Sequence, residues 1–365
     1  MLLENAVRAR FKNPTSGNNG DAFTDYAEAE PFLDALDAAD VFVVSGQGGL
    51  NDEFVEHSTG TLLALDRAIR LGKSTVMLSQ GIGPITNLKL SGLARLVLPR
   101  VDLTFLREGL SGPGVLKSLG CRADRILVTG DDAIEMALQS SQNSSLSLAF
   151  ARLPRNSGDS LLSAGSVNWY SKEAALGDAI GINARVTYYS AVANDDLQPL
   201  REVIHELGVE FHAPLLGLPI WRPRNEGDLL AIHRLLSGYE RQADAGQTLD
   251  SPEKLIQQIG NCRIVITGSY HAAVFALALG IPVVALCNSP YYDWKFKGLA
   301  TQFGAGLVLV PARDSAFKTK LADAARELWE GAPELKPGLI GAARKQLVAA
   351  REAFSKVQAL VASTK

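Results

Sequence analysis

The sequence predicts an α/β protein in which two doubly wound domains each carry a parallel sheet. Short apolar runs rich in β-branched residues alternate with segments of good helix propensity, the arrangement that parallel sheets require. Several of these runs end in glycine-rich turns, which are typical of the carboxyl ends of such strands. Between residues 138 and 162 the alternation gives way to a stretch rich in Ser, Asn, Gln and Pro, which predicts a linker between the domains.

The first domain is expected over residues 1–150, and its pattern becomes clear from residue 40. Residues 13–21, NPTSGNNGD, have the composition of a loop. The predicted strands are residues 41–44, 75–79, 103–106 and 126–129, and the predicted helices are residues 61–71 and 112–119. Glycine turns follow the first two strands, at residues 45–50 (SGQGGL) and 80–84 (QGIGP).

The second domain is expected over residues 178–335 and shows the same alternation. Its predicted strands are residues 179–182, 264–267, 283–286 and 307–310, with a short extended segment at residues 210–214. Its predicted helices are residues 196–207, 228–237, 252–259 and 272–279. Two charged amphipathic helices follow, at residues 316–328 and 337–362.

Composition and charge exclude several functional classes. The net charge of −3 and the isoelectric point near 6.0 give no support for nucleic-acid binding. No apolar run approaches the roughly 18 residues that a membrane-spanning helix needs, and charges near the start argue against a signal peptide. The three cysteines share no CxxC spacing, which fits reduced core thiols and argues against a metal site. We therefore expect a cytoplasmic location.

The most informative stretch for chemistry lies between residues 262 and 303. His271 stands on the turn between the predicted strand at residues 264–267 and the predicted helix at residues 272–279. Ligands of open α/β sheets bind outside the carboxyl ends of the strands, and a helix N-terminus offers N–H groups to an anion. A lone histidine is more often a core or capping residue, but this position makes His271 the leading catalytic candidate.

Residues 251–286, SPEKLIQQIGNCRIVITGSYHAAVFALALGIPVVAL, resemble the signature of the polysaccharide pyruvyl transferase family. That signature has a strand, an Arg-x-His turn and an Ala-rich helix that ends in Gly-Ile-Pro. Ser269 stands here where the family usually has Arg, so the triplet reads Ser-Tyr-His. Residues 40–49 and residues 107–133 also resemble conserved turns of the family.

The resemblance implies a fold of the glycosyltransferase-B type, with two Rossmann-like domains facing a cleft. A terminal helix at residues 336–365 would pack back on the first domain. The implied reaction moves a pyruvyl group from phosphoenolpyruvate to hydroxyls of a sugar, in a surface polysaccharide or its lipid-linked precursor. It needs no metal and no cofactor. The expected partners are phosphoenolpyruvate and a glycan or lipid-linked oligosaccharide acceptor, with at most peripheral membrane contact.

Further groups are expected in the donor pocket of the second domain. Arg185 follows the strand at residues 179–182, where the family uses an Arg, and Arg suits bidentate recognition of carboxylate or phosphate. Lys295 lies on the loop after the next strand, where the family has a Lys, and we predict that it supplies the charge that Ser269 lacks. The hydroxyls of Ser269 and Tyr270 are further donor ligands. A surface ion pair for Arg185 and a solvated lysine for Lys295 are the structural alternatives.

The glycine turns of the first domain are expected to hold the acceptor. Gly48 and Gly49 allow a backbone to approach a ligand closely, and Arg107 is either an acceptor contact or part of a structural ion pair. Asp52, Asp131 and Asp132 are possible acids or bases, with helix-cap and turn roles as the alternative.

Two other functions remain open from the sequence. The first is a nucleotide-sugar-dependent glycosyltransferase of the same architecture, which commonly has a Glu after its diphosphate-binding turn. No acidic residue lies between His271 and Asp293, which counts against it. The second is a non-catalytic, glycan-binding relative, which the replacement at Ser269 and the shortened amino end suggest.

Overall fold

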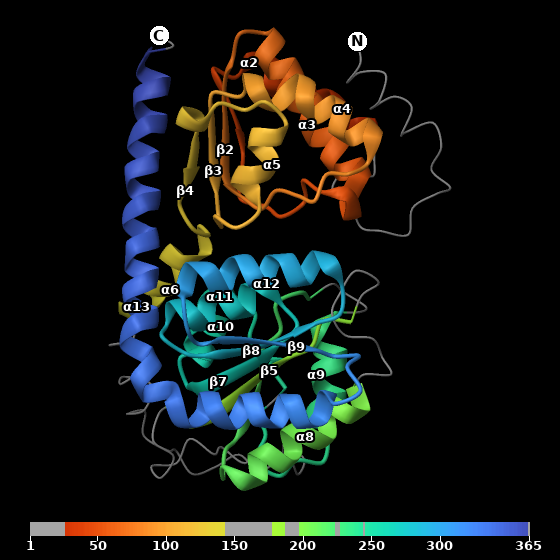
Figure 1. Ribbon diagram of the computed structural model, residues 1–365, viewed down its shortest axis with the longest axis vertical. Coiled ribbons are helices and arrows are strands. Elements are labelled where there is room, and N and C mark those ends of the chain that lie inside the picture. Colours follow the sequence, from red (N-terminus) through yellow and green to blue (C-terminus); the bar gives the residue numbers. More distant parts are fainter. Residues whose placement is uncertain (1–25, 143–176, 187–196, 223–226, 244, 364–365) are drawn as a thin grey trace, which may run out of the picture. The chain divides into compact units, whose positions relative to one another are not determined.

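The computed structural model describes residues 26–142, 177–186, 197–222, 227–243 and 245–363, which form two compact units (Figure 1). The first unit comprises the chain up to residue 132 together with residues 348–365, and the second comprises residues 133–347. Each unit carries one sheet in which all the described strand pairs are parallel. The predicted α/β class with a parallel sheet in each of two units is therefore confirmed. The predicted loop at residues 13–21 and residues 143–162 of the predicted linker lie outside the described residues, whereas residues 138–142 of that linker are helical.

The sheet of the first unit has the strand order β1-β2-β3-β4. Its strands are β1 (Val41–Val44), β2 (Ser74–Gln80), β3 (Leu103–Leu106) and β4 (Ile126–Val128). The helices of this unit are α2 (Tyr26–Ala38), α3 (Val55–Arg70), α4 (Leu88–Val97) and α5 (Gly112–Ser118). Val76 and Phe105 of the sheet share a buried cluster with Ala353, so the end of the last helix packs on this sheet.

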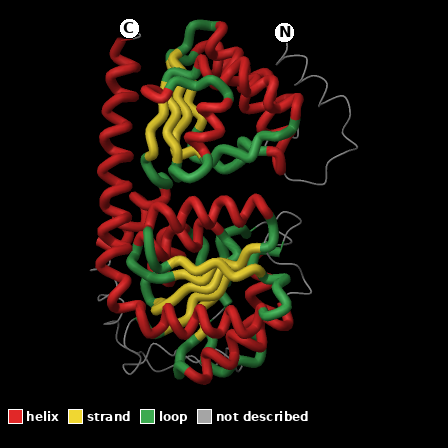
Figure 2. The backbone as a smooth tube through the Cα atoms, viewed as in Figure 1, coloured by secondary structure: helices red, strands yellow, loops and turns green. Residues whose placement is uncertain are grey.

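The sheet of the second unit has the strand order β6-β5-β7-β8-β9, with β7 at its centre. The strands of both sheets are yellow in Figure 2. Its strands are β5 (Ala179–Asn183), β6 (Leu215–Gly217), β7 (Cys262–Thr267), β8 (Val283–Cys287) and β9 (Leu307–Pro311). Its helices are α6 (Ala133–Gln142), α8 (Leu197–Glu210), α9 (Asp228–Leu236), α10 (Pro252–Ile259), α11 (Tyr270–Ala278) and α12 (Pro290–Phe303). The last helix, α13 (Phe317–Ser363), begins in this unit and ends in the first.

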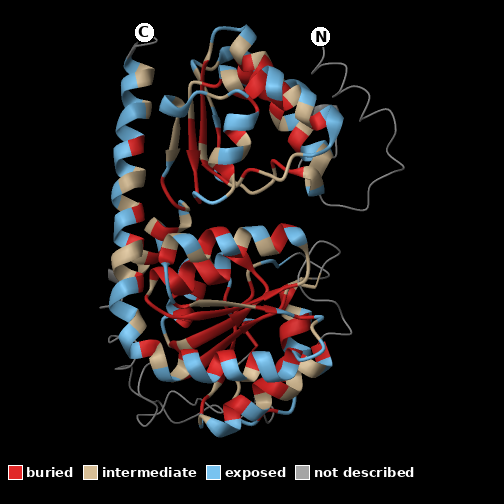
Figure 3. Cartoon of the chain, in the orientation of Figure 1, coloured by how far each residue is buried: buried red, intermediate tan, exposed pale blue. Residues whose placement is uncertain are grey.

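Helix α11 is apolar on all sides and is buried except at its second residue (Figure 3). It connects the buried strands β7 and β8 and also contacts α6, α10 and α12. An all-apolar helix of this kind is stable only inside a core. Gly280 follows it with a φ of +77°, a conformation that glycine adopts without strain. The single exposed residue of α11 is His271, which stands in its first turn.

Three sequence predictions about secondary structure are wrong. Residues 290–303, which were expected to form a loop, form α12, whose first turn is capped by Ser289 and begins with a proline. The short strand near residue 214 is β6, at Leu215–Gly217, because α8 continues to Glu210. The two predicted C-terminal helices are one helix, α13.

Helix α13 contains Pro333, which lies between the two predicted helices, and Pro337, with which the second of them was expected to begin. A proline inside a helix removes one hydrogen bond and costs about 3 kcal/mol. Burial of Leu328, Ala332 and Leu339 on either side of the prolines offsets this cost. Figure 1 shows a bend in α13 before its long straight part, as expected of a helix that contains prolines.

Candidate active site

The turn between β7 and α11 is held by a hydrogen bond from its own strand. The backbone N–H of Ser269 donates to Oγ1 of Thr267 at 2.8 Å, and that hydroxyl donates to Oδ1 of Asn183 on the neighbouring strand β5 at 3.1 Å. Ser269 is buried and is the N-cap residue of α11, although its hydroxyl makes no capping hydrogen bond. The two strand ends are therefore tied together at the carboxyl edge of the sheet.

Arg185 is held by a fully buried carboxylate that the sequence analysis missed. Its Nε and Nη2 donate to Asp228 at 2.8 and 3.1 Å, and its guanidinium lies 5.6 Å from the centre of the Trp221 ring. Asp228 also accepts from Nδ2 of Asn183 at 2.9 Å and from the backbone N–H groups of Ile220 and Trp221 at 2.9 and 3.0 Å. Five donors thus surround one carboxylate that has no exposed surface. Arg185 has a fixed orientation as a result.

A continuous hydrogen-bond network therefore connects the two halves of the predicted donor pocket. It runs from Ser269 through Thr267 and Asn183 to Asp228, and from there to Arg185. The sequence suggested Arg185 and Ser269 but gave Asp228 only as the start of a helix. Asp228 and Arg185 are 43 residues apart in the sequence, and no local sequence pattern predicts a contact at that separation.

His271 and Lys295 both lie near one aromatic side chain, that of Tyr270. The Tyr270 ring is buried and meets the His271 ring edge-on, with their centres 5.6 Å apart. Nζ of Lys295 lies 5.9 Å from the centre of the same tyrosine ring. Tyr270 therefore places both the histidine and the lysine near the N-terminus of α11.

Lys295 lies on a helix, α12, and not on a loop as predicted. Its ammonium sits 3.7 Å from the centre of the Tyr291 ring and 5.4 Å from that of Tyr292. Aromatic faces attract a cation and restrict where it can move. Lys297, one turn away from Asp293, instead makes an exposed ion pair with it at 2.6 Å. The hydrogen bond to this carboxylate, together with its charge, raises the pKa of Lys297.

Arg107 occupies the corresponding edge of the first unit, after β3. Its side chain is only 4% exposed, and Nη1 lies 3.8 Å from Oδ2 of Asp131. Gly81 lies directly against the guanidinium, since a Cβ at this position would come within 2.6 Å of Nη2. The ion pair with Asp131 agrees with the structural role of Arg107 that the sequence analysis named, and the contact with an acceptor stays a prediction.

The glycine turn at residues 45–50 is fixed by two buried side chains. Asn51 donates from Nδ2 to the carbonyl of Gly48 at 2.7 Å, and Ser58 donates from Oγ to the carbonyl of Gly49 at 2.7 Å. The backbone N–H of Gly81 donates to the carbonyl of Gln47 at 2.8 Å, which joins this turn to the next one. Gly48 and Gly49 thus belong to a rigid backbone surface at the carboxyl edge.

Asp52 has a turn role, one of the alternatives that the sequence analysis named, because it binds the segment just before α4. Its carboxylate accepts from the backbone N–H and the hydroxyl of Thr86 and from the N–H of Asn87. Burial raises the pKa of Asp52, but these hydrogen bonds more than compensate and hold the pKa below its usual value. Asp132 donates its backbone N–H to the hydroxyl of Ser79 at 3.0 Å.

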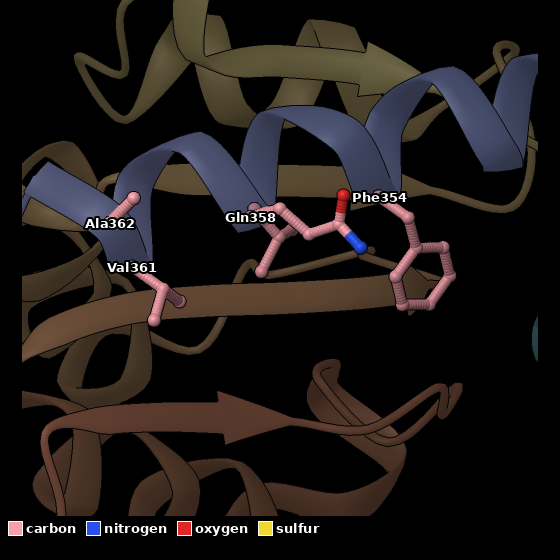
Figure 4. A pocket seen from close by; sticks show the side chains of 5 residues that line it. Phe354, Gln358, Val361 and Ala362 are labelled. Carbon is pink, nitrogen blue, oxygen red and sulfur yellow. The ribbon is translucent and has the colours of Figure 1, made fainter.

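Other features of the described residues offer less chemistry. No group of three or more His, Cys, Asp and Glu among them could hold a metal ion. None of the helices in the described ranges is long and apolar enough to cross a membrane. A groove of about 440 Å³ on α13 is lined by apolar side chains and one glutamine, with no ionisable group (Figure 4).

Comparison with known sequences identifies the class of protein. A profile of the polysaccharide pyruvyl transferase family matches residues 4–290, a range that contains the turn with His271 and both glycine turns. This chain therefore belongs to the polysaccharide pyruvyl transferase family and is a transferase. A comparison with curated protein sequences finds no significant match.

Solved structures of similar fold include, by their titles, UDP-N-acetylglucosamine 2-epimerases and a glycotransferase. A putative UDP-N-acetylglucosamine 2-epimerase from Listeria monocytogenes matches with a TM-score of 0.57 and 15% identity, over 95% of this chain and 82% of that one. The UDP-GlcNAc 2-epimerase from Neisseria meningitidis bound to UDP-GlcNAc gives 0.55 and 15%, over 94% and 84%. A glycotransferase of kitacinnamycin gives 0.50 and 12%, over 93% and 85%. At these identities the likeness establishes the glycosyltransferase-B type of fold and nothing more.

Proposed function

We propose that this protein transfers the pyruvyl group of phosphoenolpyruvate to two hydroxyls of a sugar, in a surface polysaccharide or its lipid-linked precursor. The observation that supports this most is the set of groups around the first turn of α11. Here the exposed His271, the lysine Lys295 against its tyrosine rings and Arg185 held by Asp228 belong to one carboxyl edge. His271 and Arg185 lie within the range that matches the family, and Lys295 lies five residues beyond its end.

The donor requires cationic anchors because it carries a phosphate and a carboxylate. Arg185 uses two of its five N–H donors on Asp228, which fixes the plane of the guanidinium against the ligand. Lys295 is the second cation in this proposal and takes the place of the family arginine at position 269. The hydroxyls of Ser269 and Tyr270 and the N-terminus of α11 add donors for the phosphate oxygens.

The reaction needs one proton on the donor and loses two from the acceptor. His271 protonates the methylene carbon of phosphoenolpyruvate, which leaves an oxocarbenium-like centre. A sugar oxygen attacks the central carbon, which carries the positive charge, the bond between that carbon and the phosphate ester oxygen breaks, and phosphate leaves. A second hydroxyl of the same sugar then attacks the same carbon and closes the ketal. Of the two protons that the hydroxyls release, one leaves with the phosphate and the other restores the acid form of His271. This scheme needs no metal and no cofactor beyond the donor substrate.

In this proposal the second unit binds the donor and the first unit binds the acceptor. Gly48, Gly49 and Arg107 are the acceptor-side residues, since they form a rigid polar edge after β1 and β3. The reaction would then take place on the cytoplasmic side, and a lipid-linked acceptor would bring the protein into peripheral contact with the membrane.

Thermal denaturation with a panel of ligands tests the proposal. Phosphoenolpyruvate at about a hundred times its dissociation constant should stabilise the native state by roughly 2.7 kcal/mol. Stabilisation by UDP-, GDP- or CMP-sugars without any response to phosphoenolpyruvate would instead favour a nucleotide-sugar-dependent glycosyltransferase, a function compatible with the fold. A protein that responds to a glycan but to no donor would be a glycan-binding relative without catalysis.

A further inference from the structure

His57, which the sequence analysis did not single out, lies against the glycine turn of the first unit. It stands in the first turn of α3, just after the turn at residues 45–50 that precedes this helix. A Cβ on Gly49 would come within 2.6 Å of Cδ2 and 2.9 Å of Nε2 of the His57 ring. The ring can occupy this position only because residue 49 has no side chain.

One hydrogen bond orients the ring. Nε2 of His57 lies 2.5 Å from Oε1 of Gln47, and an amide oxygen can only accept. Nε2 is therefore the donor of this hydrogen bond, and in the neutral ring the lone pair is on Nδ1. Because the Cδ2–Nε2 edge lies against Gly49, the Nδ1 edge lies on the opposite side of this exposed ring.

The backbone beneath the ring is rigid. Ser58, the next residue along α3, is fully buried and accepts the N–H of Asn51 while it donates to the carbonyl of Gly49. The turn is also tied to the following one, through the hydrogen bond from Gly81 to Gln47 and another from Gly83 to Leu50. A side chain that reacts with a substrate needs a rigid backbone beneath it, because a small displacement of the side chain strongly lowers the reaction rate.

We propose that His57 is the base that removes the proton of the attacking sugar hydroxyl, with Gln47 as its positioning residue. This inference rests on the proposed pyruvyl transfer. As the sugar oxygen bonds to the central carbon of the donor, its proton moves to Nδ1 of His57, which becomes an imidazolium held by Gln47. His57 accordingly acts on the acceptor and not on phosphoenolpyruvate.

The position of His57 agrees with this role. The carboxyl edge of this sheet also carries the buried Arg107 after β3 and the exposed Asp132 after β4. Oδ2 of Asp132 lies close to Gly46 at the other end of the same glycine turn, where a Cβ would be 3.2 Å away. Imidazole and carboxylate groups at the two ends of an exposed backbone turn are suited to bind sugar hydroxyls by hydrogen bonds.

The test measures phosphate release from phosphoenolpyruvate in the presence of 4-nitrophenyl galactoside, mannoside and glucoside. The wild-type chain, His57→Ala, His57→Gln and the control His233→Ala are compared. His233 is exposed on α9 of the second unit and has no part in the proposed reaction. Both substitutions of His57 should lower turnover by about 10²- to 10³-fold, the size of a general-base contribution. Stabilisation by phosphoenolpyruvate and the melting temperature should stay unchanged.

Two further measurements distinguish whether His57 acts as a base or only packs against Gly49. Imidazole added at high concentration should restore part of the turnover of His57→Ala, because the site is exposed. Gln47→Ala should lose about tenfold in turnover, while Gln47→Glu, which still accepts from Nε2, should retain it. A loss that imidazole does not restore would mean that the ring only packs on Gly49, and the proposal would be wrong.

The outcomes distinguish this inference from the function on which it rests. Wild-type turnover in both His57 variants would overturn the inference and leave pyruvyl transfer intact. Loss of phosphoenolpyruvate binding in these variants would also overturn it, since His57 would then serve the donor. If the wild-type chain released no phosphate with any glycoside, pyruvyl transfer itself would be contradicted, and the role of His57 with it.

Discussion

The carboxyl edges of the two sheets are held in place by different kinds of interaction. In the second unit, side-chain charges fix the edge, since Asp228 accepts five hydrogen bonds and holds Arg185 in place. In the first unit, hydrogen bonds to backbone groups fix it. Asn51 and Ser58 hold the turn at residues 45–50, and backbone hydrogen bonds join that turn to the one at residues 80–84. In the proposed reaction the donor carries a phosphate and a carboxylate and needs oriented cations, whereas the sugar hydroxyls need a close and rigid surface.

We expect the largest loss of stability when the buried carboxylate of the second unit is removed. Asp228→Asn should lower the free energy of unfolding by about 3 kcal/mol, because it leaves the Arg185 guanidinium without its carboxylate in a buried network. The same variant should lose stabilisation by phosphoenolpyruvate. Urea denaturation followed by circular dichroism measures the first effect, and thermal denaturation with the ligand measures the second.

A matched control is Asp250→Asn, which removes the carboxylate of an ion pair with Lys254. Both partners of that pair are more than half exposed, and pairs of this kind contribute about 0–1 kcal/mol. Equal losses in the two aspartate variants would show that the edge of the second unit does not depend on buried charge.

Lys295→Ala tests whether the ring-held lysine replaces the arginine that the family has at position 269. A charged hydrogen bond contributes about 1.5–3 kcal/mol, so phosphoenolpyruvate should bind roughly 10- to 150-fold more weakly. Isothermal titration measures the dissociation constant. Lys297→Ala, which removes only an exposed ion pair with Asp293, should bind the donor like the wild type. Equal affinity in Lys295→Ala and the wild type would exclude the lysine as an anchor and favour a non-catalytic relative.

Gly81→Ala tests the backbone side of the comparison. Its Cβ would come within 2.6 Å of the Arg107 guanidinium, whose side chain is buried and cannot move into solvent without breaking its contact with Asp131. We expect a loss of about 1–3 kcal/mol in the free energy of unfolding, as for other overpacked sites. Gly92→Ala is the control, because it lies in α4 with open space around it and should stabilise the protein by about 0.5–1 kcal/mol. Equal stability in the two variants would show that the Arg107 guanidinium can move aside, and that the carboxyl edge of the first sheet is not rigid.

The sequence predicted the strands well because their signal is local. Strands β1 and β3 have the predicted bounds, and β7 and β8 differ by one or two residues, since buried parallel strands are continuous β-branched runs. Helix α12 was missed although Ser289 and Pro290 form a recognisable N-terminal signal, because its mixed surface shows little periodicity.

The candidate site was predictable only in part, for a related reason. His271 and Arg185 stand at strand ends, and strand ends can be located from the sequence. The contact of Arg185 with Asp228 and that of His57 with Gln47 depend on how separate elements pack, and no spacing rule predicts them. The family resemblance covered the first two residues and gave no indication of the other partners.

The smallest expected effect concerns Asp52, which joins the first glycine turn to the segment before α4. Because hydrogen bonds from Thr86 and Asn87 outweigh burial and hold the pKa of its carboxyl below the usual value, its contribution to stability is present above the unfolded-state pKa near 3.9. That contribution is lost as the pH falls through the lower folded-state pKa. Asp52→Ala should therefore cost about 1 kcal/mol at pH 7, as the loss of a cap does, and markedly less near pH 3. Thermal denaturation of both proteins across this range measures the difference. A cost that does not change with pH would mean that the carboxylate charge plays no part, and that only the shape of the turn matters at the first edge.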